Sequence, residues 1–68
     1  MLIEIRNMTD TAFKAYARQR GLSERDIILA DLILRQELTT KETANKMNLS
    51  EATINVKRPY IKRMFGLL

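Results

Sequence analysis

The 68-residue chain contains no cysteine and no histidine. These absences exclude disulfides, thiol chemistry and the usual zinc, haem and iron–sulfur sites, and they remove the side chain that most often acts as a general base. There is no tryptophan, and aromatic residues make up only 6% of the chain, which argues against a stacking platform for single-stranded nucleic acid. A chain of this length forms one domain at most, with a small core.

Long apolar runs are also missing. The densest stretch, residues 27–34, is eight residues long and is interrupted by Asp31, whereas a membrane-spanning helix needs about 20 residues. Residues 1–7 contain Glu4 and no long apolar run, so they do not resemble a signal peptide. The sequence therefore predicts a cytoplasmic protein. Hydrophobic residues account for 46% of the chain, as is normal for a packed domain.

Basic residues are unevenly distributed. Residues 1–38 contain six basic and six acidic side chains, whereas residues 39–68 contain six basic and two acidic ones, so the second segment carries the whole excess charge of +4. A one-sided basic segment is typical of a protein that binds a polyanion, usually nucleic acid. A solvated basic surface without a partner explains the charge equally well.

Helical spacing and capping residues predict an all-α domain of four helices, at about 10–20, 24–36, 40–47 and 51–65. Gly21 and Gly66 suit the ends of the first and last helix. The second helix is expected to be the most buried, with an apolar face at residues 27–29 and 32–34.

Capping signals support all four helix starts, and Thr9 or Asp10 suits the start of the first helix. Ser23 with Asp26 resembles a capping box, Thr39 with Glu42 is a second one, and Ser50 suits the start of the last helix. Residues 1–8 are an N-terminal stub or a short strand without a partner in the chain, and residues 9–68 form the domain.

A short helix, a tight turn and a longer basic helix form a helix-turn-helix pattern at residues 40–65. On a helical wheel, Ile54, Ile61 and Phe65 share the inward sector of the last helix. The opposite sector contains Ala52, Asn55, Val56, Pro59 and Arg63, with Lys62 at its edge. This mixture suits a DNA major groove, because asparagine pairs with adenine, small apolar side chains touch thymine methyl groups, and arginine or lysine reaches guanine or phosphate.

Several short motifs carry a family resemblance: Leu22-Ser23-Glu24-Arg25-Asp26, Lys41-Glu42-Thr43-Ala44, Met47, Leu49-Ser50, Thr53-Ile54, Ile61 and Phe65-Gly66-Leu67. With them, residues 22–67 resemble the LuxR/GerE-type helix-turn-helix domain of bacterial transcription regulators. The resemblance implies sequence-specific binding of double-stranded DNA, with the helix at 51–65 in the major groove. A dimer on two half-sites is expected, because one small module gives little specific affinity.

The resemblance also assigns roles to individual residues. Base contacts are expected from Asn55, Val56 and Pro59, and Arg63 joins them on the same outward face. Phosphate contacts are expected from helix N-termini, hydroxyls and lysines, namely Thr40, Lys41, Ser50, Thr53, Lys57 and Lys62.

The chain departs from the family pattern in four places. Lys57 stands where the family has histidine, and Asn55 stands where it has lysine. The loop before Lys41 is one residue longer and lacks the usual turn glycine. Pro59 lies inside the last helix, where it removes one hydrogen bond and is expected to kink the helix. The chain stops at Leu68, before the further helix that family members commonly use to dimerise, and the helix at 10–20 could replace its packing or its dimer surface.

An enzyme is not expected, because the sequence has no nucleophile–base pair, no glycine-rich phosphate loop and no metal-binding spacing. No cofactor, metal, membrane or small-molecule substrate is therefore implied. Besides DNA, RNA polymerase or a second copy of the chain could be a partner. Three alternatives stay open: a protein-interaction module that modulates another regulator or RNA polymerase, a sigma-factor region four, and a fragment of a larger sensor protein.

Overall fold

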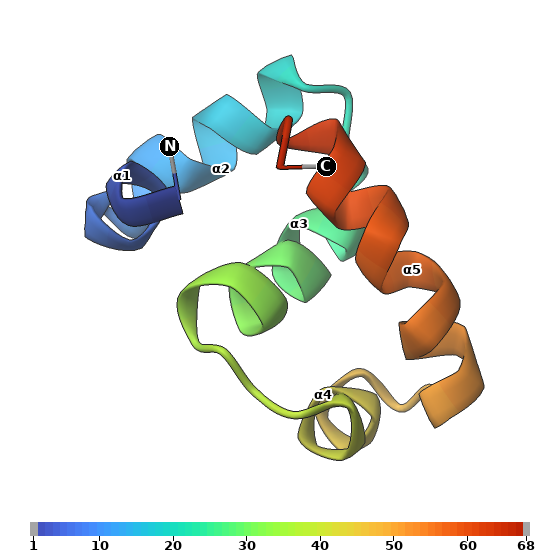
Figure 1. Cartoon of the computed structure of the whole chain (residues 1–68). Helices are drawn as coiled ribbons and strands as arrows, with labels where there is room; N and C mark the ends of the chain where they lie inside the picture. The colour runs from blue at the N-terminus through green and yellow to red at the C-terminus, as the bar shows by residue number, and fades with distance from the viewer. Residues whose placement is uncertain (1, 68) are drawn as a thin grey trace.

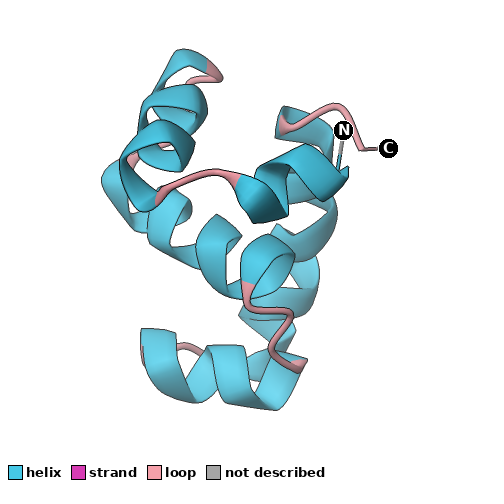
Figure 2. Cartoon of the chain, turned by 90° about the vertical axis from the view of Figure 1, so that its left-hand side faces the viewer, coloured by secondary structure: helices cyan, strands magenta, loops and turns pink. Residues whose placement is uncertain are grey.

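The computed structural model describes residues 2–67, and within this range all regular secondary structure is helical, as expected for the predicted all-α class (Figures 1 and 2). Five α-helices and one π-helical segment, η1, follow one another with short connections. Their bounds are α1 (Leu2–Asn7), α2 (Asp10–Gln19), α3 (Glu24–Ala30), η1 (Asp31–Arg35), α4 (Thr40–Met47) and α5 (Glu51–Met64). In Figure 1, α3 lies at the centre, with α5 along one side and α4 at the far end from α1 and α2.

All six helical segments contribute side chains to one core. Its aromatic part joins the two ends of the chain, because the ring of Phe13 in α2 stacks on that of Phe65 after α5 at 5.6 Å between centroids. Tyr16 lies against the same Phe65 ring, also at 5.6 Å. The aromatic residues of α2 therefore serve the core, and they anchor the C-terminal end of α5.

Residues 2–7 form helix α1, so the prediction of a stub or a short strand was wrong for them; Met1 lies outside the described residues. A lone strand would leave its backbone groups without partners, whereas a helix satisfies them internally. Ile5 is only 3% exposed, α1 packs against η1, and Arg6 forms an ion pair with Glu37 at 2.7 Å. This segment therefore belongs to the same folding unit as the rest of the chain.

The second predicted helix consists of two parts, α3 and η1. The backbone N–H of Gln36 donates to the carbonyl of Asp31 at 3.0 Å, which is the wider spacing of a π-helix. Leu32, Ile33 and Leu34 are all buried, so η1 is covered on several sides. Ile28, which was predicted on the buried face, is 53% exposed. It lies on the same side of the helix as Asp31, which is half-buried.

In the connection from η1 to α4, a residue other than glycine takes the left-handed backbone conformation. Glu37 has φ of 53°, and the next N–H, that of Leu38, donates to the carbonyl of Leu32 at 3.0 Å. A residue with a Cβ pays about 1–2 kcal/mol for this conformation. The connection is held in place by this backbone bond and by the ion pair with Arg6.

Candidate nucleic-acid interface

The two helices of the predicted helix-turn-helix are fixed by side-chain caps. Thr39 Oγ1 accepts from the Glu42 N–H at 3.1 Å, and Glu42 Oε1 accepts from the Thr39 N–H at 2.9 Å, so the predicted capping box is confirmed. The hydrogen bond from the Thr39 backbone lowers the pKa of Glu42, because it stabilises the carboxylate. Ser50 Oγ accepts from the Thr53 N–H at 3.1 Å and caps α5, also as predicted.

The turn between α4 and α5 brings the two helices into contact at a steep angle. Asn48 takes a left-handed conformation with φ of 57°, and the Leu49 N–H donates to the carbonyl of Ala44 at 2.9 Å. Ala44 is buried, as expected for a close approach of helices, and Thr43 is fully buried beside it. In Figure 1, α4 is seen almost end-on, whereas α5 runs along the side of the molecule.

Helix α5 has the two faces that the helical wheel predicted. Ile54 and Ile61 are fully buried and Phe65 is 4% exposed. The opposite face is open to solvent, with Val56 at 74% exposure and with exposed Ala52, Asn55, Pro59 and Arg63. The four residues predicted to contact bases therefore share one accessible surface, which we call the outer face of α5.

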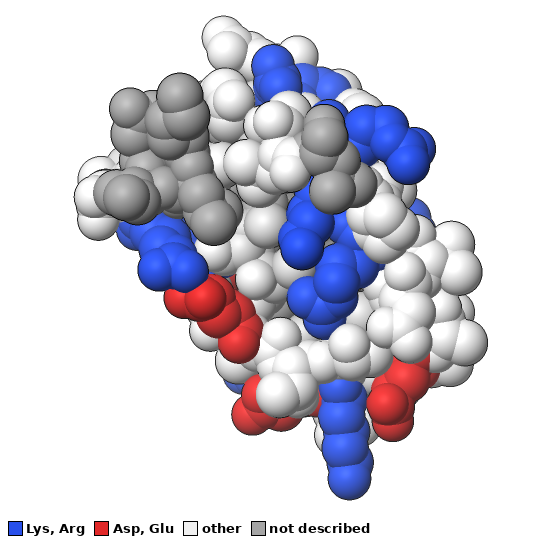
Figure 3. Space-filling view, in the orientation of Figure 1, with Lys and Arg blue, Asp and Glu red and all other residues white. Residues whose placement is uncertain are grey.

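Unpaired basic side chains lie near this outer face. Lys41, Lys62 and Arg63 form no ion pair with a described carboxylate. Figure 3 shows lysine and arginine side chains over the middle and C-terminal part of α5, while the acidic side chains on the same view lie lower, toward α1, α4 and the first turn of α5. The C-terminal part of α5 thus displays positive charge that other described side chains do not neutralise.

Lys57, predicted as a phosphate contact, has a partner within the protein. Its Nζ lies 3.0 Å from Asp26 Oδ1 and 5.6 Å from the centre of the Tyr60 ring. The proposed capping box at Ser23 is only half formed, because Ser23 accepts from the Asp26 N–H while the Asp26 carboxylate turns to Lys57 instead. This pair joins α3 to α5, and it gives Lys57 a bracing contact in the free protein.

Arg58 is a residue that the sequence analysis did not select. Its Nη2 donates to Thr40 Oγ1 at 3.0 Å, and Thr40 Oγ1 donates to Asn55 Oδ1 at 3.4 Å. These contacts link the first residue of α4 to two residues one turn apart on α5. No sequence pattern indicates them, because the bonded residues are 15 and 18 positions apart.

The predicted hydroxyl contacts are partly occupied. Ser50 Oγ and Thr53 Oγ1 lie 2.8 Å apart and bond to each other, and Thr40 is engaged by Arg58 and Asn55. Ser50 is exposed, whereas Thr40 and Thr53 are half-buried. The predicted phosphate set therefore divides into lysines, of which Lys41 is exposed and Lys57 and Lys62 are half-buried, and hydroxyls that also hold α4 and α5 in place.

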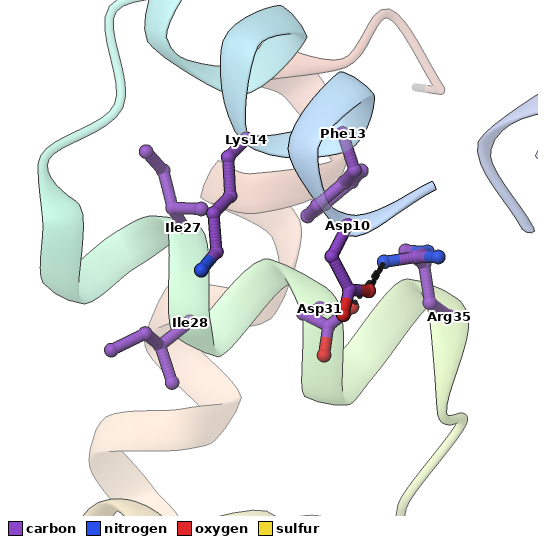
Figure 4. Close-up of a pocket in the computed structure, with 7 residues that line it drawn as sticks. All are labelled: Asp10, Phe13, Lys14, Ile27, Ile28, Asp31 and Arg35. Carbon is purple, nitrogen blue, oxygen red and sulfur yellow. Dashed lines mark hydrogen bonds and ion pairs between the residues drawn. The ribbon is translucent and has the colours of Figure 1, made fainter. Parts of the chain in front are cut away.

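The hollows outside the outer face of α5 include two that are bordered by charged side chains of α1, α2 or η1. One, of about 300 Å³, is bordered by Arg58 and Lys62 of α5 and by Arg6 and Glu37. The other, of about 200 Å³, lies between α2 and α3; in Figure 4, Arg35 meets Asp10 at one end of it and Lys14 extends along it. Among the described residues, no group of three acidic side chains is placed to hold a metal ion.

Comparisons with known proteins give no relatives for this chain. No protein-family model matches it, and neither a curated protein nor a solved structure matches it significantly. Within the described residues, none of the helices combines the length and the apolar character needed to cross a membrane.

Proposed function

We propose that this chain is a sequence-specific double-stranded DNA-binding module of bacterial transcription regulation, similar to the LuxR/GerE type and acting in the cytoplasm. Helix α5 would lie in the major groove, and α4 would cross the phosphate backbone and brace it. The observation that supports this most directly is the outer face of α5, where accessible Asn55 and Val56 lie beside Lys62 and Arg63, which no described carboxylate neutralises.

The chemistry of this face suits a groove. Val56 and Ala52 offer small apolar contacts to thymine methyl groups, and Asn55 offers polar contacts to base edges. Arg63 reaches bases or phosphates, while Lys62 and Lys41 contribute the electrostatic, sequence-independent part of binding. Because one such module has limited specific affinity, we expect two copies on a two-part site.

The test is an amide NMR titration of the labelled chain with a random-sequence duplex, at low and at higher salt. We expect shifts at residues 40–41 and 50–63 and a loss of affinity as salt rises, because phosphate contacts release counterions. Shifts confined to other elements, or no shifts at low salt, would contradict the proposal.

A matched pair of charge reversals makes the test sharper. Arg63→Glu on α5 and Lys14→Glu on α2 change the net charge equally, but only Arg63 lies on the outer face. We expect Arg63→Glu to weaken duplex binding about tenfold or more, in line with the loss of about 1–3 kcal/mol from a good base contact. Equal effects of both variants would mean that net charge alone governs binding.

The outer face also favours a second candidate function, a protein-interaction module. Val56 is 74% exposed and Tyr60 37%, and exposed Pro59 lies three positions after Val56, on the neighbouring surface of the helix. Such an apolar strip suits a protein partner, for example another regulator or RNA polymerase. Combined Lys62→Glu and Arg63→Glu changes discriminate between the two functions, because they should abolish DNA binding and leave an apolar protein contact largely intact.

A further inference from the structure

The direction of the hydrogen bonds between Arg58, Thr40 and Asn55 follows from the chemistry of the three groups. A guanidinium group only donates, so Thr40 Oγ1 must be the acceptor of the 3.0 Å bond from Arg58. The single hydroxyl hydrogen of Thr40 is then free to point to Asn55, whose Oδ1 lies 3.4 Å away. This assigns the carbonyl oxygen of the Asn55 amide to the side that faces α4.

The amide of Asn55 is therefore presented to the groove with a defined polarity. The amide group is planar, so when Oδ1 faces Thr40, the Nδ2 group with its two hydrogens faces away from α4. Asn55 is exposed, and it lies beside Ala52 and Val56 on the outer face of α5. What it offers to a ligand in front of this face is a hydrogen-bond donor.

Both ends of this arrangement are held in place. Asn55 and Arg58 are three residues apart on α5, so they are neighbours on one side of the helix. Thr40 is the first residue of α4, directly after the capping box that fixes the start of this helix. Reversing the amide would remove Asn55 Oδ1 as the acceptor of the Thr40 hydroxyl hydrogen.

We propose that Asn55 is a specificity-determining donor that selects guanine, and discriminates against adenine, at the base pair it faces. This inference rests on the proposed DNA-binding function. Bidentate reading of adenine needs the asparagine oxygen to accept from the adenine N6 amino group, but this oxygen faces Thr40. Guanine instead presents two adjacent acceptors, N7 and O6, to the two hydrogens of Nδ2, whereas adenine places its own amino donor there.

The prediction differs from the simplest sequence-based expectation, in which asparagine pairs with adenine. Removing the Thr40 hydroxyl should release the amide and restore that pairing. Thr40→Val has nearly the same shape without the hydroxyl, and Thr40→Ser keeps the hydroxyl and serves as the matched control.

The experiment is selection of bound duplexes from a pool with a randomised central segment, for the wild-type chain, Thr40→Val, Thr40→Ser and Asn55→Ala. The base pair that Asn55 faces is identified as the position where Asn55→Ala removes the preference. There we expect guanine over adenine by about tenfold or more in the wild type and in Thr40→Ser, which corresponds to the discrimination of a good base contact. We expect Thr40→Val to shift this one position toward adenine.

The outcomes separate this inference from the proposed function. Salt-sensitive selection of duplexes with adenine facing Asn55 in the wild type overturns the inference and leaves DNA binding in place. The same holds if Thr40→Val and wild type select identical bases. If no duplex is enriched over the pool, the DNA-binding function fails, and the role of Asn55 fails with it.

Discussion

The two halves of the chain differ in how many of their basic side chains form ion pairs. In residues 1–38, arginines pair with acids of the same half: Arg6 with Glu37, Arg18 with Glu24, and Arg35 with Asp10 and Asp31. In residues 39–68, the only described ion pair, from Lys57, uses an acid of the first half, and Lys41, Lys62 and Arg63 pair with no described carboxylate. Among the described side chains, three of the six basic residues in the first half thus pair with acids of that half, whereas one of the six in the second half pairs, and its partner lies in the first half.

This difference indicates that basic side chains with partners inside the protein contribute less to a candidate interface than those without. Sequence composition assigned the excess to residues 39–68, but it treated all six basic residues there alike. Two of them have internal contacts: Lys57 holds α5 against α3, and Arg58 donates to Thr40. The others have no described acidic partner and are available to a ligand. Breaking individual contacts in each half therefore has different expected consequences.

The largest effect on stability is expected from Arg35→Met, in residues 1–38. The Arg35 side chain is 15% exposed, bonds to Asp10 and Asp31 at 2.9 Å each and to the Met8 carbonyl, and lies over the Phe13 ring. Its loss leaves the part-buried Met8 carbonyl and Asp31 Oδ1 without this donor, whereas Asp10 is 84% exposed, so we expect destabilisation by about 2 kcal/mol, within the range for such groups. Urea unfolding measures this change.

Arg35→Lys is the control for that variant. A lysine keeps the charge and can hold one carboxylate, but it cannot reproduce the planar fork of donors. Its loss of stability should therefore be smaller than that of Arg35→Met. Equal losses would show that charge contributes nothing and that the guanidinium geometry alone matters.

A smaller effect is expected where the two halves are joined. Asp26 is 9% exposed, and Asp26→Asn keeps an oxygen near Lys57 but removes the charge. We expect this change to lower the free energy of unfolding by about 1 kcal/mol. It also frees Lys57 for phosphate, so the dependence of duplex binding on salt should steepen by up to about 0.9 in log–log slope. Salt titrations of both proteins measure this, and an unchanged slope would restrict Lys57 to its structural contact.

The smallest effect on stability is expected on acidification. It can be measured for one carboxylate in each half, Glu24 and Glu42. Glu24 and Glu42 both have pKa values below the ordinary 4.5, Glu24 chiefly through the hydrogen bond from Arg18 and Glu42 through the Thr39 backbone. A lowered pKa in the folded state gives stability that is complete above pH 4.5 and is lost as pH falls through the folded value.

Melting temperatures of the wild type, Glu24→Gln and Glu42→Gln between pH 3 and about 6 test this. Each variant should lose less stability on acidification than the wild type. Added salt should diminish the contribution of Glu24, because the Arg18 pair is exposed, and should change that of Glu42 less. Parallel acid curves for all three proteins would contradict the assignment.

Most of the fold was predictable because its signals are local. The helix at 40–47 begins and ends where Thr39, Glu42 and Asn48 indicate, and the inward residues of α5 follow helical spacing. The contacts that organise the candidate interface were not predictable, since Lys57 meets Asp26 across 31 positions and Arg58 meets Thr40 across 18. Helix α1 was missed for a similar reason, because six residues are too few for helical spacing to show and packing on η1 holds them.

The π-helical segment η1 has a consequence for how the length of this chain can vary. A π-turn holds one residue more than an α-turn along nearly the same path, since its bonds span five residues instead of four. A single-residue insertion or deletion between α3 and α4 can thus be absorbed as an exchange of one turn type for the other, without displacing α4 from α5. A variant of this chain with one residue fewer in η1 should therefore keep α4 against α5, with an α-turn in place of the π-turn.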